Sequence, residues 1–444
     1  MARLIGALLE NAGKGEREML IEKESNTALP RMTKIRQQFP NDTITDLASH
    51  IERELDKATI RRRLSPGMKV AIGIGSRGIG QILEIVKLLV QCLKNRGVDP
   101  FVVPAMGSHG GATAEGQLEI LESYGISPEV ISAPIMASMD VKKIGTLPDG
   151  LDLYFSRAAL DAHAIIPMNR VKPHTSFQGD VGSGLMKMLV IGFGKHIGAS
   201  TIHPWGADQF SHIIPKAAES LIQNLPIAFG LAIVENAYGS PSLLEAIPAD
   251  EIPMREKDLL KQARKEMARL PFLRLDVLVV QECGKNISGP CIDPNVTGRF
   301  AVRYLSRIPV ELEIGRLVAL SLTEESHGNA PGISVCDVIT RRLADKINPD
   351  HTYINAITSS APEAARIPLI ASSDLEAISI GVRTCYRVQP SQVRLIIIKN
   401  TAELHSFWAS EALLKEIHAN PLLVIESEAS ECRFDSEGNL LALY

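Results

Sequence analysis

The sequence predicts an α/β protein made of two α/β domains. Apolar, β-rich runs alternate along its 444 residues with amphipathic helical stretches, which is typical of sheets covered by helices. The clearest unit is a buried strand at residues 68–75, a helix at 79–94 with apolar residues at helical spacing, and a second strand at 100–104. Sheets of this kind bind ligands at the carboxyl ends of their strands.

Two domains are indicated by a long charged helix at residues 249–269, which has few apolar faces and is the best linker candidate. We expect an N-terminal domain over residues 1–270 and a C-terminal α/β domain over residues 271–424. Turn residues near the end predict a closing hairpin at about 425–444, which is able to return to the first domain. The other expected elements are strands at 164–168, 227–234, 275–281, 317–322 and 393–399 and a helix at 335–347.

Composition and charge exclude several classes of protein. The net charge of -4 and the absence of a dense Lys/Arg stripe argue against binding to nucleic acid, which needs clustered positive charge. No apolar run reaches the roughly 18 residues that a membrane span needs, and residues 1–19 lack the apolar core of a secretory signal. The 6 cysteines are scattered without a CxxC pair, as expected of reduced thiols, so we expect a cytoplasmic protein.

A glycine-rich turn follows the first strand. Residues 73–78 satisfy the pattern G-x-G-x-x-G between a strand and a helix, as in dinucleotide-binding sheets. The next strand, however, runs through residues 101–106 without the acidic residue that would bind the ribose of a nicotinamide cofactor. What remains is a helix N-terminus with free backbone amides beside Arg77, suited to a phosphate or carboxylate. A tight turn without a ligand is one alternative, and a bound nicotinamide cofactor is another.

His109 follows the second strand at its carboxyl end, within a run of glycines. The glycines let a substrate approach the backbone closely, and Thr113 is placed to cap the next helix. A histidine in a turn more often has a structural role. Its position beside the anion-binding turn of the neighbouring strand nevertheless favours a functional one.

The segment 169–188 holds the densest set of polar and glycine residues, and it again follows a strand. A proline and three glycines prevent a long helix over most of it, so we expect His174 on a loop and Lys187 in the first turn of the following helix. Apolar neighbours would desolvate Lys187, lower its pKa and make the amine nucleophilic. A lysine that reaches past these neighbours to solvent is the alternative. His203 follows a second glycine-rich stretch at 192–198.

At these residues the chain resembles the nickel-pincer-cofactor-dependent lactate racemase family, as a divergent branch of 2-hydroxyacid racemases and epimerases. The resemblance covers most of the chain and rests on Ser108-His109-Gly110, Pro173-His174, Lys187, His203 and Glu282-x-x-Lys285. It implies that Lys187 holds a nickel-pincer nucleotide covalently and that His203 ligates the nickel. It also implies that His109 and His174 are the catalytic proton-transfer pair.

The same resemblance assigns roles to one loop in each half of the chain. Gly75, Ser76 and Arg77 would contact the cofactor. Lys285 would reach from the second domain as a catalytic and substrate-binding residue, with Glu282 beside it as a second contact to the substrate. Both loops depart from the pattern of the racemases, since the first lacks an acid-x-Thr-Arg sequence and Glu282 stands where a glutamine is usual.

The reaction that the resemblance implies is inversion of C2 of a 2-hydroxy acid by hydride shuttle to the tethered nickel-pincer nucleotide. We expect the active site in the cleft between the two domains, with the N-terminal one as the catalytic and cofactor-binding domain. One histidine would remove the hydroxyl proton as the C2 hydride leaves, and the other would serve the opposite enantiomer. We expect a lactate-like substrate or a sugar acid. A sugar acid is as credible as lactate because the second domain carries many polar side chains: Glu282, Lys285, Asn286, Ser288, Asp293 and Arg299. We expect no nucleic-acid or membrane partner and leave a homo-oligomer open. The alternative is a non-catalytic protein that binds an anionic nucleotide or a sugar acid.

Overall fold

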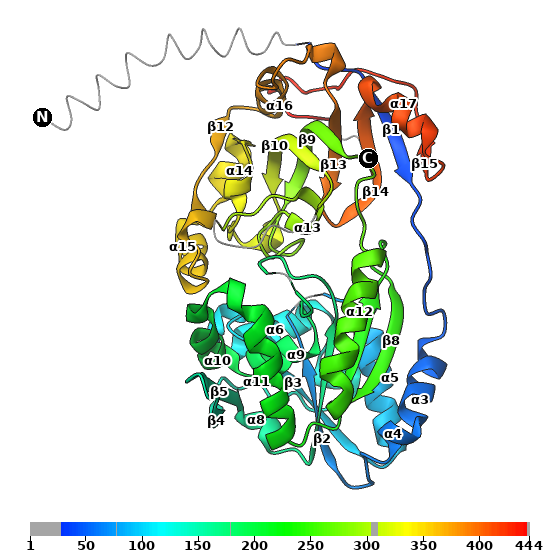
Figure 1. Cartoon of the computed structure of the whole chain (residues 1–444), viewed down its shortest axis with the longest axis vertical. Helices are drawn as coiled ribbons and strands as arrows, with labels where there is room; N and C mark the ends of the chain where they lie inside the picture. The colour runs from blue at the N-terminus through cyan, green and yellow to red at the C-terminus, as the bar shows by residue number, and fades with distance from the viewer. Residues whose placement is uncertain (1–27, 77, 178, 303–309, 442–444) are drawn as a thin grey trace, which may run out of the picture. The chain divides into compact units, whose positions relative to one another are not determined.

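The computed structural model divides into two compact units, and it describes residues 28–76, 78–177, 179–302 and 310–441. The N-terminal unit comprises residues 40–267. The C-terminal unit comprises residues 28–39 and the described residues from 268 onward. Each unit is built on a sheet of mainly parallel strands with helices against it (Figure 1), so the α/β class predicted from the sequence is confirmed.

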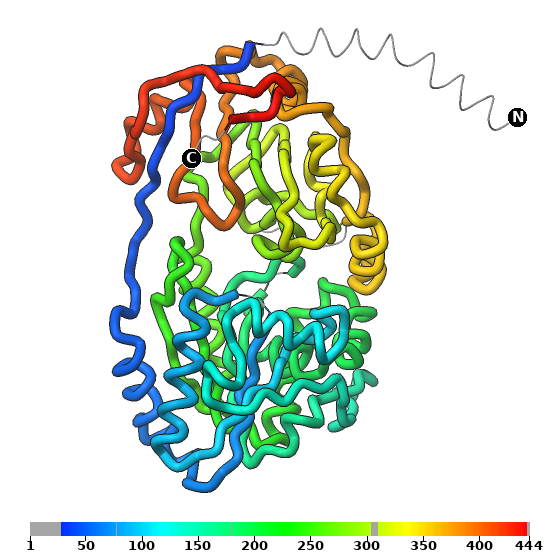
Figure 2. The backbone as a smooth tube through the Cα atoms, turned by 180° about the vertical axis from the view of Figure 1, so that it is seen from behind, coloured from blue at the N-terminus to red at the C-terminus, as the bar shows by residue number. Residues whose placement is uncertain are grey.

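The division differs from the expected domains at both ends of the chain. Residues 28–39 and the C-terminal segment both belong to the C-terminal unit, whereas the sequence favoured a first domain over 1–270 and left open the return of the final hairpin to it. The cause is strand pairing, because β1 (Met32–Gln37) pairs antiparallel with β14 (Glu403–Ser410). Figure 2 shows the blue segment of β1 beside the orange and red segments of this unit. Residues 1–27 of the expected first domain lie outside the described residues.

The N-terminal unit has a five-stranded sheet. Its strands are β2 (Lys69–Ile74), β3 (Asp99–Pro104), β6 (Ala164–Arg170), β7 (Phe229–Glu235) and β8 (Pro241–Pro248). They lie in the order β3-β2-β6-β7-β8, with the first four parallel and β8 an antiparallel edge. A separate hairpin pairs β4 (Val141–Thr146) with β5 (Asp152–Ser156). The four strands predicted for this part of the sequence are confirmed.

Helices cover both faces of this sheet. The core on one face includes α5 (Ile82–Asn95), and the core on the other face includes α12 (Ile252–Glu266). β2 contributes to both, since Ile72 faces the core with α5 and Ala71 faces the core with α12, as expected for a strand buried on two sides. The other helices are α3 (Leu47–Asp56), α4 (Ala58–Arg61), α6 (Ala114–Ser123), α7 (Pro128–Ile131), α8 (Arg157–Leu160), α9 (Leu185–Lys187), α10 (Lys195–Ile202) and α11 (Phe210–Asn224).

The strand order places a topological switch point between β2 and β6. From β2 the chain passes through α5 to β3 on one side, and from β6 it passes through α9, α10 and α11 to β7 on the other side. The loops that follow β2 and β6 therefore diverge to opposite faces of the sheet. Open α/β sheets bind their ligands in the crevice that such diverging loops leave at the carboxyl ends of the strands.

The C-terminal unit has an eight-stranded mixed sheet in the order β12-β11-β10-β9-β13-β14-β1-β15, whose first five strands are parallel. The strands not yet given are β9 (Arg274–Cys283), β10 (Glu313–Leu322), β11 (Val338–Thr340), β12 (Leu369–Ala371), β13 (Leu395–Asn400) and β15 (Leu423–Ile425). Its helices are α13 (Pro294–Thr297), α14 (Arg341–Lys346), α15 (Pro349–Thr358), α16 (Asp374–Arg383) and α17 (Leu414–Ala419). Along the described ranges, no helix combines the length and apolar character needed to cross a bilayer.

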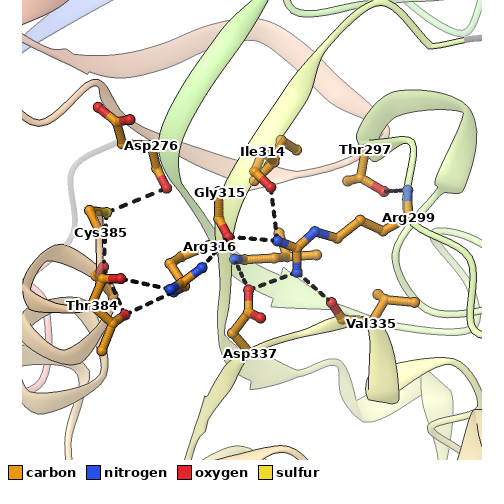
Figure 3. Close-up of polar contacts among 12 residues, drawn as sticks. Asp276, Thr297, Arg299, Ile314, Gly315, Arg316, Val335, Asp337, Thr384 and Cys385 are labelled. Carbon is orange, nitrogen blue, oxygen red and sulfur yellow. Dashed lines mark hydrogen bonds and ion pairs between the residues drawn. The ribbon is translucent and has the colours of Figure 1, made fainter. Parts of the chain in front are cut away.

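Arg299 ties together the amino ends of two strands in this unit (Figure 3). Its guanidinium donates to the Asp337 carboxylate at 2.7 Å and to the carbonyls of Ile314, Gly315 and Val335 at 2.9–3.0 Å. These groups lie at the start of β10 and just before β11. Arg299, one of the polar side chains from which a sugar acid was expected, therefore lies at the edge of the sheet opposite to the carboxyl ends of the strands.

Three expected elements differ from the structure. The helix predicted at 335–347 is wrong in its first half, where the chain forms strand β11 before α14 begins. The charged helix at 249–269 is not a linker, because α12 buries Leu259 and Leu260 in the core of the N-terminal unit. The hairpin expected at 425–444 has its turn, closed by a backbone hydrogen bond from the Asp435 amide to the Asn439 carbonyl. Up to residue 441, where the described part of this segment ends, it forms isolated bridges in place of paired strands of its own.

Candidate functional site

Two loops at the switch-point end of the sheet are joined by Ser76 and His109. Ser76 follows β2, His109 follows β3, and the Ser76 Oγ lies 2.5 Å from His109 Nδ1. The Tyr124 hydroxyl, just after α6, donates to the Ser76 carbonyl at 2.7 Å and so holds the first of these loops. Because the imidazole of His109 is held through Nδ1, proton exchange with a substrate would use Nε2.

The loop that carries His109 lies so close to α6 that it requires glycine. Gly110 has a φ of +67°, and a Cβ added to Gly116 would lie 2.1 Å from the Gly110 carbonyl oxygen. Thr113 caps α6 as the sequence predicts, since its Oγ1 accepts the Gly116 amide at 3.0 Å. Close packing and capping together hold His109 at the end of β3.

His174 lies on a loop that is closed at its base. Lys172 and Ser183 pair through two backbone hydrogen bonds of 2.8 and 2.9 Å. Asn169, near the end of β6, donates from Nδ2 to the carbonyl of the residue before α9 at 2.9 Å. The predicted arrangement, a loop at His174 followed by a helix that carries Lys187, is confirmed by α9.

The Lys187 amine lies against the His174 ring. Lys187 Nζ is 2.6 Å from His174 Nε2, while His174 Nδ1 accepts the Ser176 amide at 3.0 Å. Because an amide N–H only donates, Nδ1 carries no proton, and a neutral imidazole then carries its proton on Nε2. Lys187 accepts that proton in a hydrogen bond only when its lone pair is available. The pair therefore suits a neutral, nucleophilic amine.

Glu256 supports the helix that carries Lys187. This carboxyl group, on α12, is fully buried and accepts the Met186 amide at 2.9 Å at the start of α9. Burial raises the pKa of Glu256 to about 7, and its Oε1 has no hydrogen-bond partner among the described residues. Beyond Lys187 the chain continues as a π-helical turn at Met188–Gly192, a rare form that is frequent at functional sites.

A chain of ring contacts connects His174 with His203, which follows α10. His174 stacks on Phe177 with a centroid distance of 4.2 Å, and Phe177 meets Phe210 edge-on at 5.5 Å. The Phe210 ring in turn lies 5.6 Å from the His203 ring. Burial lowers the pKa of His203 to about 4, and the charge that Lys187 carries when protonated adds to that lowering. Above about pH 4 His203 is thus the neutral imidazole that binds metals.

The N-terminal unit links these groups through the segment after Lys187. The Gly107 amide, in the loop that carries His109, donates to the Gly192 carbonyl at 3.0 Å. Gly75, after β2, approaches the same segment, since a Cβ there would lie 3.3 Å from Met188 Cε. The predicted site residues that the N-terminal unit holds at this end of its sheet are Gly75, Ser76, His109, His174, Lys187 and His203.

Three other predicted site residues are placed elsewhere. Arg77 lies outside the described residues. Glu282 and Lys285 lie in the C-terminal unit, at and just after the carboxyl end of β9. Glu282 Oε1 accepts Asn400 Nδ2 at 3.0 Å, and the Lys285 amide donates to Ser326 Oγ at 2.8 Å. The roles of these three residues toward a cofactor or a substrate stay predictions.

Three buried polar residues around the site were missed by the sequence-based prediction. Lys195 and Gln117 are fully buried beside the His109 loop, and Glu256 is buried beneath α9. The available signal for Lys195 was a lysine within the glycine-rich stretch 192–198. Glu256 gave a weaker signal, because α12 carries many charged residues that face solvent.

Comparison with known proteins identifies the N-terminal part of the chain. Residues 12–203 match the lactate racemase N-terminal domain. The N-terminal part of the chain is therefore similar to the N-terminal domain of lactate racemases. The matched range of this racemase-like chain contains the four residues that carried the resemblance in this half: His109, His174, Lys187 and His203.

Solved structures extend the likeness in fold. A crystal structure of a protein from Thermotoga maritima has a TM-score of 0.52 at 13% identity, and the match covers 82% of this racemase-like chain and 98% of that one. The lactate racemase apoprotein from Thermoanaerobacterium thermosaccharolyticum has a TM-score of 0.41 at 15% identity, with 79% and 85% covered, which is too low to call the folds the same. No curated protein matches the sequence.

Proposed function

We propose that this chain is a racemase or epimerase that inverts C2 of a 2-hydroxy acid, with a nickel-pincer nucleotide held covalently at Lys187 and nickel ligated by His203. The observation that carries the proposal is the 2.6 Å contact between Lys187 Nζ and His174 Nε2 inside a lactate racemase N-terminal domain. When bound, the nucleotide would supply an acceptor for the C2 hydride. The substrate would be lactate-like or a sugar acid.

The residues at the site fit such a group. An amine with an available lone pair, set by the hydrogen bonds of His174, is able to form the covalent link. His203 is neutral above about pH 4 and is therefore able to ligate a metal. Within the described ranges, no group of three or more His, Cys, Asp and Glu side chains is arranged to hold a metal ion. A metal at His203 would accordingly take further ligands from the bound molecule.

The chain's own residues would move protons and orient the substrate. His109 and His174 come from different loops, after β3 and β6, and two bases from separate loops suit a reaction that accepts both enantiomers. Ser76 would hold the His109 imidazole through Nδ1 and leave proton transfer to Nε2. Lys285 would bind the substrate carboxylate, and Glu282 would bind a hydroxyl group of the substrate.

Intact mass and metal analysis test this proposal. The chain is produced in cells that also make the enzymes of cofactor assembly, and we expect a mass adduct, located on Lys187 by peptide fragmentation, together with bound nickel. Lys187→Arg is expected to lose the adduct, because a guanidinium has no lone pair for the link. Lys216→Arg on α11, an exposed lysine of the same unit, serves as the matched control and is expected to keep it.

Unmodified and nickel-free protein from such cells contradicts the proposal. If that protein instead binds an anionic nucleotide or a sugar acid reversibly, with the Lys187→Arg variant binding equally well, the chain is a binding protein rather than an isomerase. Calorimetric titration with each ligand class separates these two results.

A further inference from the structure

A buried polar pair, Lys195 and Gln117, lies between the loop that carries His109 and the segment that carries Lys187 and His203. Both side chains are fully buried. Lys195 Nζ donates to the Pro104 carbonyl at 2.5 Å and to Gln117 Oε1 at 2.9 Å. Gln117 Nε2 donates to the carbonyls of Gly107 at 3.0 Å and of His109 at 3.3 Å. One continuous set of hydrogen bonds thus runs from Lys195 to the backbone of His109.

These hydrogen bonds connect three parts of the N-terminal unit. Lys195 begins α10, Gln117 belongs to α6, and the accepting carbonyls belong to the end of β3 and the loop after it. Along the sequence, Lys195 stands between Lys187 and His203. The pair therefore joins the segment that carries Lys187 and His203 to the loop that carries His109.

The chemistry of the pair is directional, unlike that of an apolar core. The two loop carbonyls can only accept, so Gln117 turns Nε2 toward them and Oε1 toward the Lys195 amine, which donates to it. Burial lowers the pKa of Lys195 to about 8, and a neutral amine would satisfy both of its N–H donors with the two oxygens present. Lys195 also has a φ of +56°, a conformation that costs a non-glycine residue free energy. Apolar side chains would fill this space without desolvating an amine.

We propose that Lys195 and Gln117 are positioning residues, which fix the backbone of the His109 loop relative to the segment that carries Lys187 and His203. The inference rests on the proposed function in one respect, because that function gives the position of His109 its chemical meaning. Both side chains are fully buried, so neither is placed to contact a substrate or a cofactor. The effect of the pair would pass entirely through the carbonyls of Gly107 and His109.

Histidine labelling of the protein without cofactor tests the inference independently of activity. Diethyl pyrocarbonate modifies the half-buried rings of His109 and His174, and peptide mass spectrometry gives the rate at each. We expect the ratio of the His109 rate to the His174 rate to rise about fivefold in Lys195→Met and in Gln117→Glu. This is the change in an equilibrium constant that corresponds to the loss of one buried hydrogen bond. Gln117→Glu keeps the acceptor for Lys195 but removes both donors to the loop. It therefore tests the hydrogen bonds between residue 117 and the loop carbonyls separately from the one to Lys195.

Asn236→Leu is the matched control for a general loss of stability. Asn236 is a buried amide that donates from Nδ2 to the Asp42 carbonyl at 3.0 Å and to Thr43 Oγ1 at 3.1 Å, and so holds a different loop of the same unit. We expect this variant to leave the labelling ratio unchanged. An unchanged ratio in both folded variants of the pair, or an equal rise in Asn236→Leu, overturns the inference.

A measurement on the unaltered protein remains if neither variant folds. The Gln117 side-chain amide should exchange its hydrogens with solvent slowly in ¹⁵N spectra, because the side chain is fully buried and its amide donates to two carbonyls. Rapid exchange contradicts the proposed arrangement. The labelling result stays distinct from the test of function, since a protein that never acquires nickel still shows whether this pair positions His109.

Discussion

Glu256 gives the sharpest test of the structure, because a lone carboxyl group is buried beneath the helix that carries Lys187. Burial raises its pKa from 4.5 to about 7, while the bonds it accepts from the start of α9 act in the opposite direction. Each pKa unit corresponds to about 1.4 kcal/mol. The ionised form of Glu256 therefore costs the folded state about 3 kcal/mol relative to the unfolded chain.

The sign of the pH dependence follows from the raised pKa. Below about pH 4.5 the carboxyl group is protonated in both states, and no cost arises. As the pH rises from 4.5 toward 7, the unfolded chain releases its proton while the folded state keeps it, so this contribution to stability is lost progressively. Above about pH 7 the full cost is present. Glu256→Gln removes the ionisation and keeps an oxygen that can accept the Met186 amide.

Urea unfolding at several pH values measures this contribution. The two tryptophans lie one in each unit, Trp205 in the N-terminal unit and Trp408 in the C-terminal unit, so in a Trp408→Phe background the fluorescence follows the unit that contains Glu256. We expect Glu256→Gln to match its parent near pH 4.5 and to exceed it by about 3 kcal/mol near pH 8. Subtracting the free energy of unfolding of the parent from that of the variant at each pH cancels the contributions from the titration of all other groups.

A control on the same helix separates burial from charge. Asp258 is exposed on α12, and a hydrogen bond from the Lys261 amine lowers the pKa of its carboxyl group. Asp258→Asn should change the pH profile only slightly and in the opposite sense. Equal pH profiles for Glu256→Gln and its parent, or a variant that loses stability relative to the parent at alkaline pH, would refute the account of Glu256 as a buried and unpaired acid.

Two further substitutions examine the site and the glycine-rich turn. Lys187→Met should leave the pKa of His203 well below 6.5, because burial is the larger cause of its lowering; histidine NMR titration measures it, and a pKa near 6.5 in this variant contradicts the burial of His203. Gly73→Ala should destabilise the protein by about 1–3 kcal/mol in thermal unfolding, because its Cβ would lie 2.2 Å from the buried Phe193 ring. Gly145→Ala, with no atom within 4 Å, is the tolerated control, and equal effects would refute this reasoning.

Local patterns were sufficient to predict the elements that present the site. Alternation of apolar strands and amphipathic helices predicted the α/β class, and the position of His109 after β3 followed from strand order along the chain. Thr113 was identified as a helix cap from its place before α6, and Lys187 was placed in the first turn of a helix. These features depend on neighbours within a few residues, which a sequence displays directly.

Other features depend on partners far apart in the chain. The pairing of β1 with β14 joins Met32 to Ser410, and no local pattern specifies that choice. Strand β11 has only three residues within a stretch of helical periodicity, so its neighbours β10 and β12 decide its conformation. The burial of Lys195 likewise depends on tertiary packing, because the same residue in an exposed turn would leave a similar local sequence.

The N-terminal unit is inserted, in sequence, between two strands of the C-terminal sheet. β1 is synthesised early, but its neighbours β14 and β15 leave the ribosome last, so the inserted unit is able to finish folding while β1 still waits for them. A fragment that starts at residue 268 would lack the strand between β14 and β15 and would expose an aggregation-prone edge. Anyone who expresses this half alone therefore needs to graft residues 28–39 onto it, for example as a fused strand after its C-terminus.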